Sequence, residues 1–155
     1  MLREEGVSKG IGGEVPRLPR PEQNLNTYRA LSAAIRNGWV RTAHDCSEGG
    51  LAVAVAEMCI GGRVGAWIDI DGTGVGDVWG RLWGESLGRI VVAVPAEHER
   101  TFLAAMKGHT TTVLGHVTES THLEVVDGEA SLISSDVGAL VEAWKGTLDL
   151  TGGAE

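Results

Sequence analysis

Residues that could bind an anion gather in one short turn between a predicted strand and a predicted helix. This turn, residues 44–50, carries a histidine, two carboxylates, a serine and two glycines: His44, Asp45, Ser47, Glu48, Gly49 and Gly50. Glycines let backbone N–H groups approach a ligand closely, and the first turn of a helix concentrates unpaired N–H donors. The 44–50 turn therefore suits an anion such as phosphate.

The same turn could instead serve only to cap the helix that follows. Ser47 and Glu48 are typical of a helix N-terminus, and Asp45 can accept hydrogen bonds from the loop backbone. Two carboxylates would also repel a phosphate unless a metal ion or a cation such as Arg89 lies between them. From the residues alone, both interpretations stay open.

A second polar segment, residues 84–89, precedes an apolar run that predicts a central strand. It places Glu85, Ser86 and Arg89 at the mouth of that strand, where ligand groups commonly lie in layered α/β folds. The alternative is an ordinary turn with a solvated glutamate and arginine. We expect the 84–89 segment and the 44–50 turn to converge on one cleft that faces a neighbouring domain.

The rest of the sequence offers no complete catalytic or metal site. The other histidines lack metal-ligand spacing, and Cys46 and Cys59 form no C-x-x-C pair. No phosphate-binding G-x-x-x-x-G-K loop is present. We therefore assign no catalytic residue and no metal ligand to this chain.

Composition predicts one domain and excludes several functional classes. The 155 residues are 43% apolar, which is enough for a single core. A formal net charge of -8, without a basic stripe, argues against nucleic acid as a partner. No apolar stretch is long enough for a membrane span, and the charged N-terminus is not a secretory signal. With only two cysteines, we expect a cytoplasmic protein.

Hydrophobic periodicity predicts the element order α-β-α-β-α-β-α-β-β-β-α. This order indicates an α+β layered domain with a mixed sheet. The expected caps are Asn24 for the first helix and Ser134 or Ser135 for the last, with Asp127-Gly128 as a hairpin turn. We divide the chain into a linker or extended arm (1–21), a domain (22–150) and a tail (151–155).

Two motifs carry a family resemblance. Thr42-Ala-His-Asp-Cys-Ser-Glu-Gly-Gly-Leu is followed by Trp83-Gly-Glu-Ser-Leu-Gly-Arg89 and an apolar strand. Together they resemble the last domain of the phosphoribosylformylglycinamidine synthase (formylglycinamide ribonucleotide amidotransferase) family. The similarity runs from about Gly12 to Trp144, which is nearly the whole chain, and it suggests a piece of a larger synthetase.

The resemblance implies a layered α/β/α unit like the C-terminal domain of aminoimidazole ribonucleotide synthetase. It implies an ATP-dependent ligase of purine synthesis that converts formylglycinamide ribonucleotide and glutamine-derived ammonia to formylglycinamidine ribonucleotide. ATP and magnesium would be bound mainly outside this chain. The implied partners are an N-terminal ATP-binding domain of the same enzyme, a glutaminase subunit and a small bridging subunit. Alone, the chain should be inactive.

Two departures from the family pattern keep other hypotheses open. The motifs resemble the second of the family's two repeats, whereas substrate is bound chiefly through the first, and Leu87 stands where the family usually has Gln. A non-catalytic assembly domain, in which His44, Asp45 and Glu85 are architectural, is one alternative. The other is the equivalent domain of a related ATP-dependent enzyme, thiamine monophosphate kinase-like or hydrogenase maturation-like.

Overall fold

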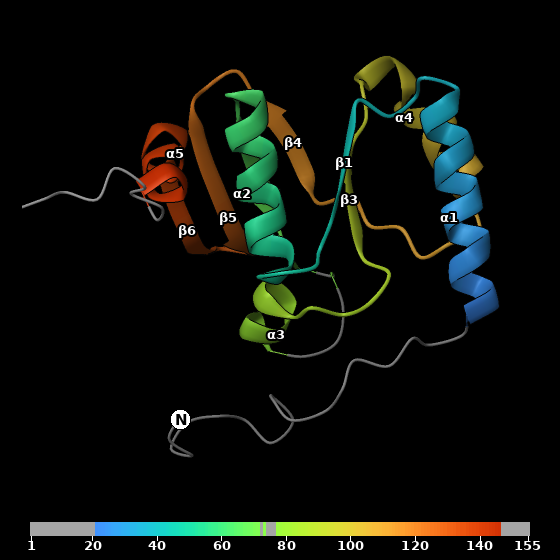
Figure 1. Ribbon diagram of the computed structural model, residues 1–155, viewed down its shortest axis with the longest axis horizontal. Coiled ribbons are helices and arrows are strands. Elements are labelled where there is room, and N and C mark those ends of the chain that lie inside the picture. The colour runs from blue at the N-terminus through green and yellow to red at the C-terminus, as the bar shows by residue number, and fades with distance from the viewer. Residues whose placement is uncertain (1–20, 72, 74–76, 147–155) are drawn as a thin grey trace, which may run out of the picture.

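The computed structural model describes residues 21–71, 73 and 77–146, and within them eleven elements follow the predicted order (Figure 1). The predicted arm (except Pro21) and the 151–155 tail lie outside the described residues. The elements are α1 (Pro21–Arg36), β1 (Thr42–Asp45), α2 (Gly50–Gly62), β2 (Gly65–Asp69), α3 (Val78–Trp83), β3 (Ile90–Ala93), α4 (Ala96–Ala105), β4 (Gly115–Thr118), β5 (His122–Asp127), β6 (Ala130–Asp136) and α5 (Val137–Gly146).

The strands form two sheets in the described part of the chain. A four-stranded sheet has the order β4-β2-β5-β6, with β2 and β5 parallel and the outer strands antiparallel to their neighbours. This confirms the α+β class with a mixed sheet. The expectation that β3 is a central strand is wrong, because β3 pairs with β1 in a separate antiparallel pair, with Asp45 opposite Ile90.

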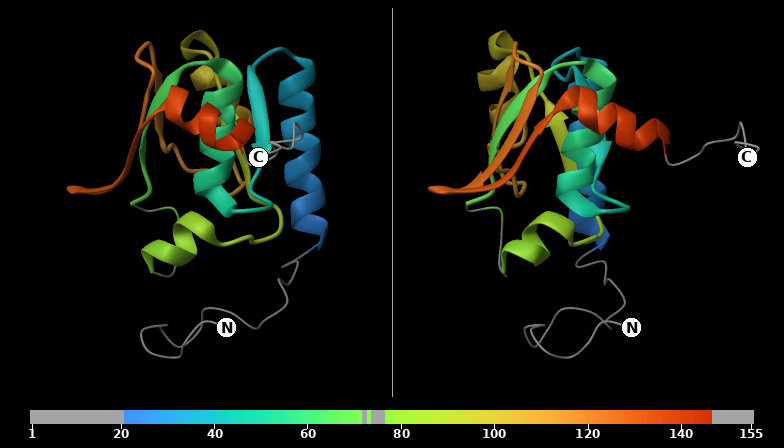
Figure 2. Two further views of the ribbon diagram at one scale, coloured as in Figure 1. Left: turned by 60° about the vertical axis from the view of Figure 1, so that its left-hand side comes forward. Right: turned by 90° about the vertical axis from the view of Figure 1, so that its left-hand side faces the viewer.

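Helix α2 lies between the two sheets (Figure 1; Figure 2, left). With α5 it covers one face of the four-stranded sheet, where Leu123 and Val125 are almost fully buried. It also contacts β1 and β3, and α1 and α4 pack near Ile90 and Val92 of β3. Contact on more than one side explains why α2 is apolar nearly all round, since a helix enclosed in this way has little polar surface to present.

Several element ends differ from the predicted ones for local reasons. Helix α1 begins at Pro21, because proline suits the first helical position, so Asn24 lies inside the helix. The carboxylate of Asp136, rather than Ser134 or Ser135, accepts a hydrogen bond from the Gly138 N–H at 2.7 Å at the start of α5. Both serines belong to β6.

The β5–β6 hairpin turns one residue later than predicted. Asp127 pairs with Ala130, so the two-residue turn is Gly128-Glu129, with Gly128 at φ 59°. Glycine adopts this left-handed conformation without the steric cost that other residues bear. Among the described helices, none is long and apolar enough to cross a membrane.

Candidate functional site

The 44–50 turn and the 84–89 segment meet in the structure. The Gly49 N–H donates to Glu85 Oε1 at 2.9 Å, and the Cys46 N–H donates to the Arg89 carbonyl oxygen at 3.0 Å. The β1–β3 pairing leads directly into both contacts. The predicted convergence of these two segments is confirmed, while a ligand or neighbour facing them stays a prediction.

The close approach of the two segments depends on Gly50. Its φ is +64°, and a Cβ there would lie 2.7 Å from the Leu82 carbonyl oxygen and 2.8 Å from the carbonyl carbon of Trp83. The first residue of α2 thus packs directly against the backbone at the end of α3. Only glycine satisfies both the conformation and the spacing.

The cap of α2 comes from a residue distant in sequence. Gly49 is the N-cap residue, and no side chain makes the usual local cap hydrogen bond. The expectation that Ser47 and Glu48 cap the helix is therefore wrong, since the Glu85 carboxylate accepts the Gly49 N–H instead. A negative charge at this end of a helix is favourable, because it faces the positive end of the helix dipole.

His44 links β1 to α2. Its Nδ1 lies 2.7 Å from the Asp45 carbonyl oxygen and its Nε2 lies 3.0 Å from Glu57 Oε2. Each ring nitrogen of His44 therefore faces a hydrogen-bond acceptor. The His44 side chain is 32% exposed, so this pair lies at the surface of the core.

Asp45 remains ionised in this turn. A hydrogen bond from the Ser47 side chain is the main cause that lowers the pKa of the Asp45 carboxyl below its ordinary value. A backbone hydrogen bond within Asp45 and the charge of His44 lower the pKa further, while burial opposes them. The carboxylate is 70% exposed and adds negative charge beside the helix end.

The guanidinium of Arg89 serves backbone carbonyls. Its Nη1 donates to the Gly84 oxygen at 3.0 Å and its Nη2 to the Arg81 oxygen at 3.1 Å. Arg89 therefore holds the end of α3 beside the Glu85 segment and forms no ion pair with an acid of the 44–50 turn. Two other candidate residues of these segments, Ser86 and Glu48, are exposed.

Two ion pairs were missed at the sequence level because their partners are remote. Glu57 pairs with His44. Arg81 binds the Asp127 carboxylate through two hydrogen bonds of 2.8 and 2.5 Å and also donates to the Ile70 carbonyl oxygen. Glu57 is a lone carboxylate in an apolar helix, and this is the signal in the sequence that could have identified it.

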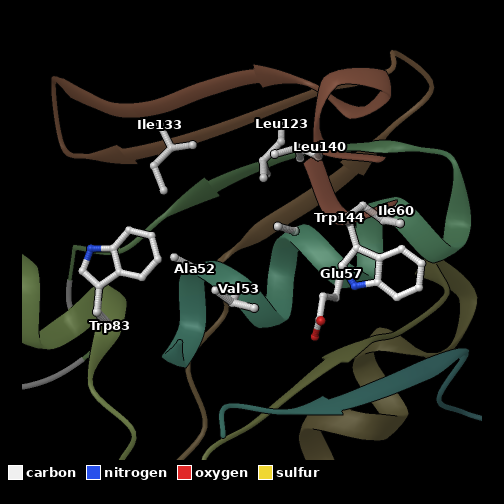
Figure 3. A pocket seen from close by; sticks show the side chains of 10 residues that line it. Ala52, Val53, Glu57, Ile60, Trp83, Leu123, Ile133, Leu140 and Trp144 are labelled. Carbon is white, nitrogen blue, oxygen red and sulfur yellow. The ribbon is translucent and has the colours of Figure 1, made fainter. Parts of the chain in front are cut away.

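An apolar groove of about 270 Å³ lies beside the site, between α2, α5 and the four-stranded sheet. Figure 3 shows Trp83 at one end and Trp144 near the other, with Glu57 as the charged residue of the lining. Trp83 directly precedes the 84–89 segment, and it is 42% exposed, whereas Trp144 is 60% exposed. Among the described residues, no cluster of His, Cys, Asp or Glu side chains is placed to hold a metal ion.

Comparison with known proteins adds a family match. Residues 2–128 match the family described as "AIR synthase related protein, C-terminal domain". A relative from Synechocystis, named phosphoribosylformylglycinamidine synthase subunit PurL, is 38% identical over 133 residues. A Cyanothece protein of the same name is 36% identical over 134 residues. These matches cover 81% and 80% of this chain, but only 17% of each relative.

Solved structures share the fold. The structure of Thermotoga maritima PurL complexed with FGAR superposes with a TM-score of 0.71 at 22% identity, covering 80% of this chain and 22% of that one. The structure of PurLQS from the same organism gives a TM-score of 0.70 at 21% identity, covering 81% of this chain and 22% of the other. Identity this low supports a common fold.

Proposed function

The chain belongs to the AIR synthase related family as a C-terminal domain, and from this premise we propose that it is the carboxy-terminal domain of a phosphoribosylformylglycinamidine synthase. The observation that carries the proposal is the bond between its two motifs, Gly49 N–H to Glu85 Oε1. The same motifs lie within the segment that is 38% identical to the Synechocystis synthase subunit.

In this role the chain forms part of an ATP-dependent ligase. The whole enzyme would convert formylglycinamide ribonucleotide and ammonia from glutamine to formylglycinamidine ribonucleotide. We assign ATP and magnesium to polypeptide outside this chain. The Arg89 guanidinium is bonded to two backbone carbonyls, which supports this assignment because it is then not directed at a phosphate. This domain would hold its neighbours in position and contribute to assembly.

The proposed partners follow from the same assignment. They are the ATP-binding domain that would precede this one, a glutaminase subunit and a small bridging subunit, all in the cytoplasm. The name PurLQS, which belongs to a Thermotoga maritima structure with the same fold, supports a multi-subunit assembly.

A purely architectural role within the same enzyme is a second candidate. Two groups of the 44–50 turn are bonded within the chain: His44 to Glu57 and the Gly49 N–H to Glu85. Leu87 is 51% exposed, which suits contact with another protein surface better than contact with a polar substrate.

A chimera tests the proposed function. This chain would replace the matching 133 residues of the Synechocystis subunit, and amidation of formylglycinamide ribonucleotide would be measured with ammonia and ATP. We expect activity from the chimera and none from the isolated chain. A folded chimera no more active than the truncated subunit, or turnover by the isolated chain, would contradict the proposal.

The two candidate roles are separated by substitution in an active chimera. His44→Ala should lower the amidation rate strongly without loss of stability if the turn assists the reaction. If the role is architectural, the rate should fall only as far as the Tm falls. Glu129→Ala, an exposed acid in the β5–β6 turn, is the matched control.

A further inference from the structure

We propose that the exposed carboxylate of Glu85 acts as an anion supplied by the chain itself, which bonds the N–H of the N-cap residue Gly49 and closes the 44–50 turn to phosphate-bearing ligands. Glu85 would then be a positioning residue that holds the 84–89 segment against the start of α2, and it would not bind a ligand itself. The inference rests on the proposed function and deepens it, because it excludes the 44–50 turn as the place where the synthase holds a nucleotide.

The position of the Glu85 carboxylate is the first support. The start of a helix presents free N–H groups and the positive end of its dipole, which is where proteins commonly bind phosphate. In this chain Glu85 Oε1 lies 2.9 Å from the Gly49 nitrogen, within the range of a charge-assisted hydrogen bond. A carboxylate from the chain itself therefore stands where a phosphate oxygen would bind.

The backbone around Glu85 is held in place. The Gly84 N–H donates to the Gly80 carbonyl oxygen at 3.1 Å, and Arg89 donates to the Gly84 carbonyl oxygen at 3.0 Å. A Cβ on Gly50 would lie within 3.0 Å of that same carbonyl oxygen. The start of α2 and the Glu85 segment thus leave no space between their backbones for a ligand group.

The charge of the turn opposes a second anion. Asp45 and Glu48 add exposed carboxylates beside Glu85. The Arg89 guanidinium is already bonded to two carbonyls, and His44 is placed against Glu57. A phosphate would have to displace Glu85 and also overcome repulsion from these carboxylates.

Binding of phosphate probes to the 155-residue chain tests the inference. Inorganic phosphate and magnesium-ATP would each be added up to about 10 mM, a range that detects even weak binding, while the amide signals of Gly49 and Gly50 are followed by NMR. We expect no saturable shift of either signal. Saturable shifts at both glycines would overturn the proposal, whatever the chimera shows about the synthase reaction.

Two substitutions and a control test the positioning role. Glu85→Ala should lower the Tm by about 3–6 °C and shift the Gly49 amide signal, because a charge-assisted bond at a helix end is lost. Glu85→Gln retains an acceptor oxygen and should lower the Tm less, which keeps the test valid if the alanine variant fails to fold. Glu129→Ala removes an exposed acid in the β5–β6 turn, outside both motifs, and should change neither quantity. Equal behaviour of the Glu85 and Glu129 variants would refute the role.

Discussion

Replacing Gly50 with alanine perturbs the point where α2 meets the end of α3. The added methyl group would lie 2.7 Å from the Leu82 carbonyl oxygen, 2.8 Å from the carbonyl carbon of Trp83 and 3.0 Å from the Gly84 carbonyl oxygen. These are backbone atoms, so no side-chain rotation relieves the clash. The two helices must separate, or the 44–50 turn must change its conformation.

The free-energy cost of Gly50→Ala has two parts. A left-handed backbone costs a non-glycine residue about 1–2 kcal/mol. Forcing an extra carbon into a packed contact costs about 1–3 kcal/mol more. The sum, about 2–5 kcal/mol, is a large fraction of the roughly 5–15 kcal/mol that stabilises a typical domain.

Urea unfolding of matched variants separates the two parts. Gly128 has φ +59° and Gly38 has φ +75°, and at both positions a Cβ would meet nothing within 4 Å. Gly128→Ala and Gly38→Ala therefore measure the conformational cost alone, and Gly50→Ala should exceed them by the packing cost. Gly61→Ala, in α2 with open space around it, should be neutral or stabilising.

A result in which Gly50→Ala is no more destabilised than Gly128→Ala would refute this reasoning. It would mean that the approach of α2 to the end of α3 is loose. In that case the Glu85 segment would lose its anchor, and the Gly49–Glu85 hydrogen bond could not be treated as fixed.

Three further predictions follow from the described contacts. Asp127→Asn should lower the Tm, because Arg81 loses its charged partner and the end of α3 loses its tie to β5; an unchanged Tm in thermal unfolding would contradict this. The lowered pKa of Asp45 means that its contribution to stability is present above the ordinary value of 3.8 and is lost as pH falls through the lower folded value. Asp45→Asn should therefore flatten the fall of Tm with pH in that acidic window, as measured by melting at stepped pH. Burial raises the pKa of the Cys46 and Cys59 thiols, so a thiol reagent near neutral pH should label them slowly in the folded chain and rapidly in urea.

Local pattern was sufficient for the order of elements but not for their pairing. Alternation and apolar spacing placed β3 correctly in the chain, yet nothing local indicates that β3 pairs only with β1 among the described strands. Which strands pair depends on how α2 lies between the two sheets. This arrangement is set by the folded chain as a whole and not by any local pattern. The class, α+β with a mixed sheet, could be predicted because it depends only on element order.

The candidate site, too, could be predicted in part from local sequence, while the rest depends on the folded chain. The 44–50 turn and the 84–89 segment were identified from residue types, and their contact was expected. The cap of α2 could not be assigned locally, because its acceptor Glu85 lies 36 residues from Gly49. The His44–Glu57 pair joins a strand to a helix face, so only the folded chain reveals it.

Helix α2 is enclosed by both sheets, and its rigidity matters for any neighbouring domain that contacts its first turn. Because this helix forms much of the main core, its amide protons should exchange with solvent only when most of the domain unfolds. A surface mounted on such an element resists deformation, and it can hold a neighbouring domain at a set distance while other parts of an enzyme move.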